Sequence, residues 1–349
     1  TGELPEYLGN MSLTTLDLSF NKLRGGIPDS FNSRMRNVFL TGNLLNGTVP
    51  DWIPEIEGPL RKFDLSYNNF TYGNSLGLNC KNQRVNLFRS FSESNKGIDP
   101  CLIIPQCSQY NNSFYINCGG DRFVDKSTGT AYDADNRDDI MFYKGGTNWA
   151  VSSTGGFFEN ETDPVTRSYI SKNTSTLPIN KPELYMNARL SPLTLTYNGF
   201  CLLDGSYTVN FQFAEIIFTH DQTYKSYGRR IFDVYIQGKL VQKDFKIEAG
   251  NEIELNFPAV MVTNKTLEIR FHWAGKGTTG IPDTGKGVYG PLISAISVTS
   301  DSEPPSEKGN STSAGNSISA GTIVGVVVAV VFVFFLVLAV LWWKGCLQR

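Results

Sequence analysis

One long apolar segment near the C-terminus limits what this chain can fold into more than any other feature. Residues 323–343 run for 21 positions without a charged side chain and with a single glycine. At about 1.5 Å of helical rise per residue, that length crosses the roughly 30 Å apolar core of a bilayer. A helix buried in a protein core is the alternative, but such helices rarely lack polar residues for so long. The sequence therefore predicts a transmembrane helix at 321–343 and a cytoplasmic stub at 344–349.

Charges on either side of this segment predict its orientation. Lys344 and Arg349 follow it, whereas Asp301, Glu303 and Glu307 precede it with one lysine. Because positive residues favour the cytoplasmic side, we expect a single-pass type I plasma-membrane protein whose N-terminal part is extracellular. Asn-x-Ser/Thr sequons, all N-terminal to the segment, agree with that side because glycans are added to extracellular regions. Their asparagines are Asn10, Asn46, Asn69, Asn111, Asn160, Asn173, Asn264 and Asn310.

Charge and cysteine content exclude several classes of function. The net charge of −2 gives no reason to expect a nucleic-acid partner. Two histidines and the lack of a Cys-x-x-Cys pair make a zinc site improbable, and no other metal or cofactor is expected. Cys346 follows the apolar segment and is a candidate for palmitoylation, with an unmodified thiol as the equal alternative.

The predicted extracellular part contains an odd number of cysteines. Disulfides are permitted outside the cell. One thiol is therefore free, or pairs between chains, or has its partner in sequence beyond this chain. The candidates for disulfide formation are Cys80, Cys101, Cys107, Cys118 and Cys201.

Leucines and asparagines recur at a fixed spacing in the first 70 residues. The pattern Leu-x-x-Leu-x-Leu-x-x-Asn, with apolar substitutions, starts at residues 13, 35 and 60 and ends at Asn21, Asn43 and Asn68. This period is typical of leucine-rich repeats, in which short strands line a concave face available to a protein partner. The chain opens in the middle of a unit and without a signal peptide, so we expect further sequence before Thr1.

A second pattern begins after a connector that we place at 71–111. Apolar and polar residues alternate with a period of two at 207–213, 232–236, 253–257 and 267–273. Short alternating strands separated by glycine, asparagine and aspartate predict an antiparallel β-sandwich or barrel over 112–299. Residues 300–320 are rich in proline, serine and glycine and should form a disordered stalk.

Several shorter motifs favour ordinary structure over chemistry. Two Gly-x-Gly-x-x-Gly matches, at 275–280 and 285–290, open no helix of a βαβ unit and are better interpreted as loops. Asp133, Asp135, Asp138 and Asp139 lack calcium-loop spacing, so we expect a solvated acidic loop. A stripe of small residues at 321, 325 and 329 could pair two membrane helices into a homodimer, and chance explains it equally well.

Motifs spread along the chain carry a resemblance to one family. They are NLFRSFS at 86–92, INCGG at 116–120, WAVSSTG at 149–155, PELY at 182–185, GSYTV at 205–209, FAEI at 213–216 and GPLISAI at 290–296. Together with the repeats, they resemble the ectodomain of plant leucine-rich-repeat malectin-domain receptor-like kinases. The resemblance implies a mixed, mostly β fold: a short leucine-rich-repeat solenoid (1–70), a malectin-like antiparallel β-sandwich, and then a single transmembrane helix.

The resemblance also implies a ligand site. In animal malectin, aromatic residues at one rim hold a glucose disaccharide, and Tyr132, Tyr185 and Phe218 fall at matching positions. The acidic residue of that family's last loop has no match, because Tyr289 or Gly290 stands there. We therefore expect carbohydrate-binding candidates at these three aromatic residues and leave carbohydrate and peptide ligands both open.

The sequence contains no kinase motifs. Neither a His-Arg-Asp loop nor an Asp-Phe-Gly segment follows the apolar segment, so this chain is not an enzyme, whereas full-length relatives would be serine/threonine kinases. The leading hypothesis is a receptor ectodomain that recognises an extracellular ligand together with a co-receptor or a second copy. A kinase-less decoy or adhesion protein and an extracellular carbohydrate-active enzyme are the alternatives.

Overall fold

The computed structural model describes most of the residues before the stalk and two after it. The described residues are 1–32, 35–53, 62–71, 85–88, 90, 107–137, 141–143, 147–157, 169–173, 182–218, 224–247, 252–280, 289–302 and 339–340. Residues Thr1–Pro304 form one compact unit, and Pro305–Arg349 form a second.

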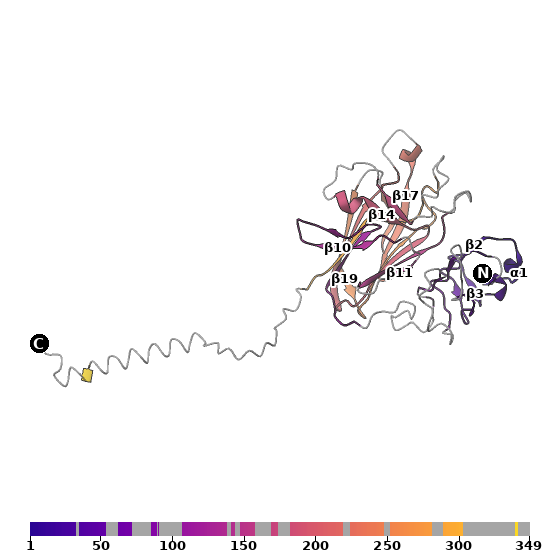
Figure 1. Cartoon of the computed structure of the whole chain (residues 1–349), viewed down its shortest axis with the longest axis horizontal. Helices are drawn as coiled ribbons and strands as arrows, with labels where there is room; N and C mark the ends of the chain where they lie inside the picture. Colours follow the sequence, from indigo (N-terminus) through magenta and orange to yellow (C-terminus); the bar gives the residue numbers. More distant parts are fainter. Residues whose placement is uncertain are drawn as a thin grey trace. The chain divides into compact units, whose positions relative to one another are not determined.

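The first 90 residues contain two parallel sheets, each built from strands one repeat apart. Figure 1 labels β2, β3 and α1 of this part. The larger sheet has the order β2-β4-β6-β7 and the smaller one the order β1-β3-β5. The bounds are β1 Gly2–Glu3, α1 Tyr7–Asn10, β2 Thr15–Asp17, β3 Leu23–Gly25, η1 Asp29–Asn32, β4 Asn37–Phe39, β5 Leu44–Leu45, β6 Lys62–Asp64 and β7 Val85–Asn86.

The repeat asparagines hold successive units together. Asn43 Nδ2 donates to the carbonyl oxygens of Leu40, in its own unit, and Leu18, in the preceding unit, each at 3.0 Å. Asn68 repeats the arrangement one unit later, with bonds to Leu65 at 2.8 Å and Leu40 at 3.0 Å. The buried carbonyls of each turn are thereby satisfied, which explains why the pattern requires an amide at this position. The buried apolar core of this part includes Val38, Leu40, Leu45, Phe63 and Leu65.

The second part of the unit is built on two six-stranded sheets. The first sheet has the order β19-β16-β22-β8-β10-β9 and the second the order β11-β12-β15-β20-β17-β18. Strands β8 to β12 span Ser113–Cys118, Phe123–Val124, Ala131–Asp135, Met141–Tyr143 and Trp149–Thr154; β15 to β20 span Thr194–Gly199, Gly205–Ala214, Arg230–Ile236, Lys239–Ile247, Glu252–Val262 and Leu267–His272; β22 spans Ala295–Ser300. A small sheet adds β13 Ile170–Lys172, β14 Asn187–Leu190 and β21 Leu292–Ile293, and the short helices are η4 Pro182–Tyr185 and η5 Tyr224–Tyr227.

The core of this part follows the predicted alternation. Tyr207, Val209, Phe211 and Phe213 of β16 all lie in one buried apolar cluster. Inward residues of β17 and β20 belong to the same cluster, and Phe271 of β20 packs edge-on against Phe211 at a centroid distance of 5.2 Å. The expectation of a mostly β fold is confirmed.

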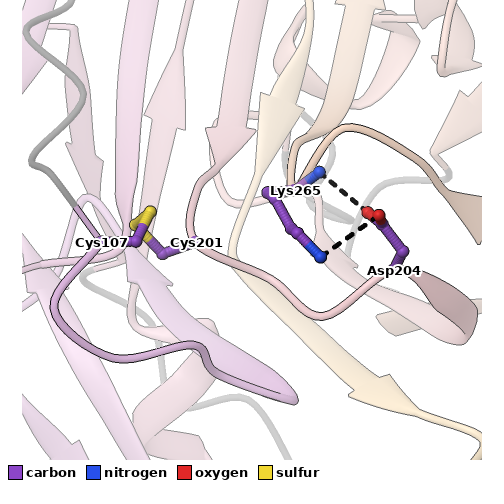
Figure 2. Close-up of a disulfide and its surroundings, with 4 residues drawn as sticks. All are labelled: Cys107, Cys201, Asp204 and Lys265. Carbon is purple, nitrogen blue, oxygen red and sulfur yellow. Dashed lines mark hydrogen bonds and ion pairs between the residues drawn. A yellow bond between two sulfur atoms is a disulfide. The ribbon is translucent and has the colours of Figure 1, made fainter.

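Among the described residues, one disulfide joins the connector to the second part of the unit. Cys107 is bonded to Cys201, which follows β15, and Figure 2 shows this bond together with Asp204, just before β16, and Lys265, between β19 and β20. Lys265 donates its backbone N–H to Asp204 at 3.0 Å and forms an ion pair with it at 3.2 Å. Cys118 is a buried free thiol. The predicted disulfide candidates Cys80 and Cys101 lie outside the described residues.

The predicted membrane segment lies almost entirely outside the described residues. Only 339–340 of the segment at 321–343 are described. Among the described residues, no helix has the length and apolar character that crossing a membrane requires. Cys346 and the glycosylation candidates Asn160 and Asn310 also lie outside the described part of the chain.

Candidate ligand-recognition face

The two large sheets have outer faces that meet different surroundings. Side chains of a strand point alternately to opposite sides, so residues between the core positions lie on the outer face of their sheet. On the second sheet, these outward residues include Ser152 of β12, Thr196 of β15, and Arg270 and His272 of β20.

Residues of the repeats cover that outer face. Asn86 Nδ2 donates to Ser152 Oγ at 2.9 Å, and the hydroxyls of Tyr67 and Thr196 lie 2.9 Å apart. Phe20 packs edge-on against His272 at a ring-centroid distance of 4.7 Å. The face of the repeats that the sequence offered to a protein partner is therefore in contact with the same chain's second sheet.

Further contacts seal this junction with apolar groups. Phe88 forms a buried cluster with Ala150, Phe200 and Cys201, against which Tyr67 packs. The Arg270 guanidinium lies over the Tyr67 ring, 5.8 Å from its centroid. Apolar burial in this cluster excludes water, so this part of the junction behaves as an interior region of the molecule.

A carboxyl group is enclosed in the junction. Asp64, on β6, is fully buried, and its Oδ1 accepts hydrogen bonds from the Ser66 backbone N–H at 3.1 Å and the Ser66 hydroxyl at 2.6 Å. Burial raises the pKa of Asp64 to about 7, against the opposing effect of hydrogen bonds from Ser66, Gly155 and Asn86. Its Oδ2 has no hydrogen-bond partner.

On the outer face of the first sheet, the structure brings together two of the three predicted aromatic residues. Tyr132 of β10 and Tyr185 of η4 belong to one buried cluster with Leu184, Ala214 and Ala295. The Tyr132 hydroxyl lies 3.0 Å from Ser297 Oγ. The rings of Tyr115 and Phe123 pack against Tyr132 at centroid distances of 5.5 and 6.1 Å.

The third predicted residue lies elsewhere. Phe218 is not part of that cluster; its ring lies 5.5 Å from the Arg230 guanidinium, and a Cβ at Gly228 would approach it to 2.0 Å. Tyr132 and Tyr185 are each 6% exposed and Phe218 is 1% exposed. None of the three therefore presents an open ring face, which is what stacking on a sugar requires.

Hydrogen-bond acceptors without partners lie beside the tyrosines. Asn117 Oδ1, Asn210 Oδ1 and Gln212 Oε1 are buried atoms with no hydrogen-bond partner. In the register of the first sheet, Glu254, Gln212, Ala295 and Asn117 follow one another across four strands. Unsatisfied buried acceptors are costly, so these three amide oxygens mark this face as a candidate site.

The carboxylates of Glu252 and Glu254 lie close enough to Tyr185 to affect its pKa. Burial raises the pKa of Tyr185 to about 12, and the negative charges of Glu252 and Glu254 add to that increase. Both glutamates are exposed residues of β19. This face thus combines tyrosine hydroxyls, amide oxygens and carboxylates around a floor made of Ala214 and Ala295.

The expectation of a solvated acidic loop is wrong for two of its aspartates. Asp133 and Asp135 are residues of β10, and Asp135 is fully buried. Arg189 donates to both Asp135 carboxylate oxygens at 2.6 Å, and Asp133 accepts from Trp149 Nε1 at 3.0 Å. A buried arginine partner, distant in sequence, provides the charge that makes this burial possible. Asp138 and Asp139 lie outside the described residues.

The predicted glycosylation sites differ in exposure. Asn10, Asn46, Asn69 and Asn264 are exposed, Asn111 is half-buried, and Asn173 is only 7% exposed. A glycan is attached to the side-chain nitrogen, so the exposed group offers the more accessible acceptors.

Sequence reasoning missed the residues that brace this region. Nothing in the sequence marked Arg189 or Arg230, whose partner Glu215 lies 2.7 Å from Arg230 Nε. Glu215 does stand inside the FAEI motif, and that motif was the available signal. Asn210 and Gln212 were correctly placed opposite the core by alternation, but alternation does not reveal that their oxygens lack partners.

Comparison with known proteins identifies the family. The model of the malectin domain matches residues 112–296, which is more than half of the 349 residues. The chain belongs to the malectin-domain family. A leucine-rich-repeat model also matches residues 12–33.

The curated relatives are receptor-like kinases of Arabidopsis thaliana. A probable leucine-rich repeat receptor-like serine/threonine-protein kinase is 44% identical over 353 residues, covering 97% of this chain and 33% of the relative. A second, the probable kinase RFK1, is 42% identical over 351 residues, with 96% and 33% covered. The chain thus spans about a third of the length of the curated relatives it matches.

Distant likenesses occur among solved structures. The plant receptor-like kinase FER is similar over 54% of this chain and 42% of that chain, with 17% identity and a TM-score of 0.34. A Bacteroides uniformis beta-glucuronidase covers 54% of this chain and 18% of its own, with 13% identity and a TM-score of 0.35.

Proposed function

We propose that this chain is the extracellular recognition part, with membrane anchor, of a plasma-membrane receptor-like kinase. The family match, the relatives' names and the eight sequons on one side of the apolar segment support this proposal. In it, residues 1–70 are a short leucine-rich-repeat solenoid, 112–299 are the recognition domain, and 321–343 span the membrane. The chain itself carries no kinase motif, so phosphorylation belongs to the longer relatives.

The ligand binds the outer face of the first sheet. The single observation that carries this is that the repeats contact the outer face of the second sheet, whereas the outer face of the first sheet holds the amide oxygens of Asn117, Asn210 and Gln212 without partners among the described residues. A bound ligand would supply the hydrogen bonds that Gln212 and Asn210 lack. The ligand is an extracellular carbohydrate or peptide. A co-receptor binds the same ligand.

Binding to the full-length chain in detergent micelles tests this assignment. Isothermal titration with a panel of cell-wall oligosaccharides and peptides would first identify a binder. Gln212→Ala should then weaken its binding about tenfold, because a hydrogen bond in a buried site is lost. The matched control is Gln242→Ala, an exposed glutamine of β18 on the other sheet. Equal affinity in both variants, or no binder in the panel, would argue against this face as the site.

A further inference from the structure

The outer face of the first sheet is rich in acceptors and negative charge. Glu252 and Glu254 of β19 are exposed, and Glu183 of η4, also exposed, is two residues from Tyr185. None of the three has an ion-pair partner within the described chain. These exposed carboxylates can therefore contact a cation without breaking an ion pair within the described residues.

A second observation, independent of the carboxylates, points to a ligand at the same place. Gln212 is 9% exposed, lies directly across from Glu254 in the sheet, and has a buried Oε1 without a partner. Asn117 is 3% exposed and also has a free amide oxygen; Ala295, between the two residues, contributes only a methyl group. Both free atoms are acceptors, so they need a donor.

The charged groups on this face favour a cationic ligand. Since the tyrosine rings are nearly buried, they do not provide the flat exposed surface on which a neutral sugar stacks. The exposed carboxylates of Glu252 and Glu254 instead attract a cation. An ammonium or guanidinium group carries several donors and no acceptor, which matches what this face lacks.

We infer that the face formed by Tyr132, Tyr185, Gln212, Glu252 and Glu254 binds a positively charged peptide segment through a lysine or arginine side chain. This inference rests on the proposed function, because it names the ligand class for the same site. The carboxylates contact the cationic group, and the amide oxygens accept its N–H donors. The peptide backbone lies along the row of residues that crosses β19, β16, β22 and β8.

The test uses two peptides that differ only in charge. Acetyl-Gly-Lys-Lys-Gly-amide and its twin with both side chains acetylated are titrated calorimetrically into the full-length chain in neutral detergent. We expect the charged peptide to bind about tenfold more tightly than the acetylated twin, and more weakly as salt is raised.

Two double variants separate this face from general attraction of a cation. Glu252→Gln/Glu254→Gln should weaken binding of the lysine peptide about tenfold, because charge-assisted hydrogen bonds are lost. Glu3→Gln/Glu6→Gln removes the same charge from exposed glutamates of the repeats and should leave the affinity unchanged. Thermal unfolding of both variants should match that of the unmodified chain, since all four side chains are exposed.

Three outcomes would overturn the inference. These are equal binding of the two peptides, equal effects of the two double variants, and no detectable binding of the lysine peptide. A neutral glucan oligosaccharide distinguishes failure of the ligand class from failure of the face. If the oligosaccharide binds and Gln212→Ala abolishes that binding, the position of the site is supported and the cationic ligand is rejected. If no ligand responds to any variant on this face, the proposed function is rejected as well.

Discussion

Gly290 illustrates how a single residue joins two motifs that lie far apart in the sequence. Its φ is +84°, and a Cβ there would lie 1.9 Å from the Ser191 carbonyl oxygen. The Gly290 carbonyl accepts a hydrogen bond from Arg230 Nη1 at 2.8 Å, and Arg230 is also paired with Glu215. The glycine of GPLISAI and the glutamate of FAEI therefore serve the same buried arginine.

Substitution of Gly290 tests this close approach. Gly290→Ala should lower the free energy of unfolding by about 3 kcal/mol or more, because the backbone must move and the conformation is left-handed. Gly129→Ala is the matched control: its φ is +73°, but a Cβ there meets nothing within 4 Å. Its cost should stay near 1 kcal/mol, from backbone strain alone. Chemical denaturation measures both, and similar losses would show that the contact with Ser191 is unimportant.

At the scale of secondary-structure elements, equivalent positions on the repeat strands have different environments. Asp17, Phe39, Asp64 and Asn86 are paired in register across β2, β4, β6 and β7. Asp17 and Asp64 also make the same turn, each accepting the N–H of the residue two positions later. Asp17 is exposed and Asp64 is fully buried, because only the later strands meet the second part of the unit.

The pH dependence of stability should reveal this difference. The pKa of Asp64 is raised from 3.8 to about 7, so the protein loses stability as pH rises from about 4 to about 7 and no further above that. The asparagine in Asp64→Asn cannot ionise. The free energy of unfolding of this variant, minus that of the unmodified chain, should therefore rise by roughly 2–4 kcal/mol over that pH range.

The control for this prediction is Asp17→Asn, which should show no such trend. Burial, and secondarily the charge of Arg270, lowers the pKa of His272 from 6.5 to about 4. This histidine therefore makes the protein less stable as pH falls below about 6.5, which is the opposite trend to that of Asp64. Because both proteins contain His272, its contribution cancels in the difference. Urea titrations at several pH values give these free energies, and a flat difference for Asp64→Asn would contradict the buried environment.

At the scale of the whole compact unit, the repeats and the β-sandwich form a continuous structure. Gly156 lies at the junction, where a Cβ would stand 3.0 Å from Phe39 Cε2. The disulfide between Cys107 and Cys201 is in the same buried cluster as Phe88. One outer face of the sandwich is therefore in contact with the repeats, and the proposed ligand face is the other.

Widening the junction should loosen it without affecting the sandwich core. Gly156→Val places a branched side chain against Phe39, and we expect hydrogen exchange to increase about tenfold in residues 37–41 and 150–154. Exchange in β16 should stay as in the unmodified chain. Gly280→Val is the control, because a Cβ there meets nothing within 4 Å. Unchanged exchange at 37–41 would mean that these contacts do not hold the junction.

The sequence by itself determined the elements and their faces. Spacing alone fixes which leucines are buried in each repeat, and alternation fixes that Phe211 is inside and Gln212 outside, because strand and repeat geometry are local. Only the tertiary structure decided which outer face contacts the repeats, that Asp64 is buried while Asp17 is not, and that Asp135 pairs with Arg189. Those outcomes depend on contacts between segments that are far apart in the sequence, as between Asp135 and Arg189 or between Tyr67 and Thr196. Burial, charge pairing and unmet hydrogen bonds arise from such contacts, which local patterns do not reveal.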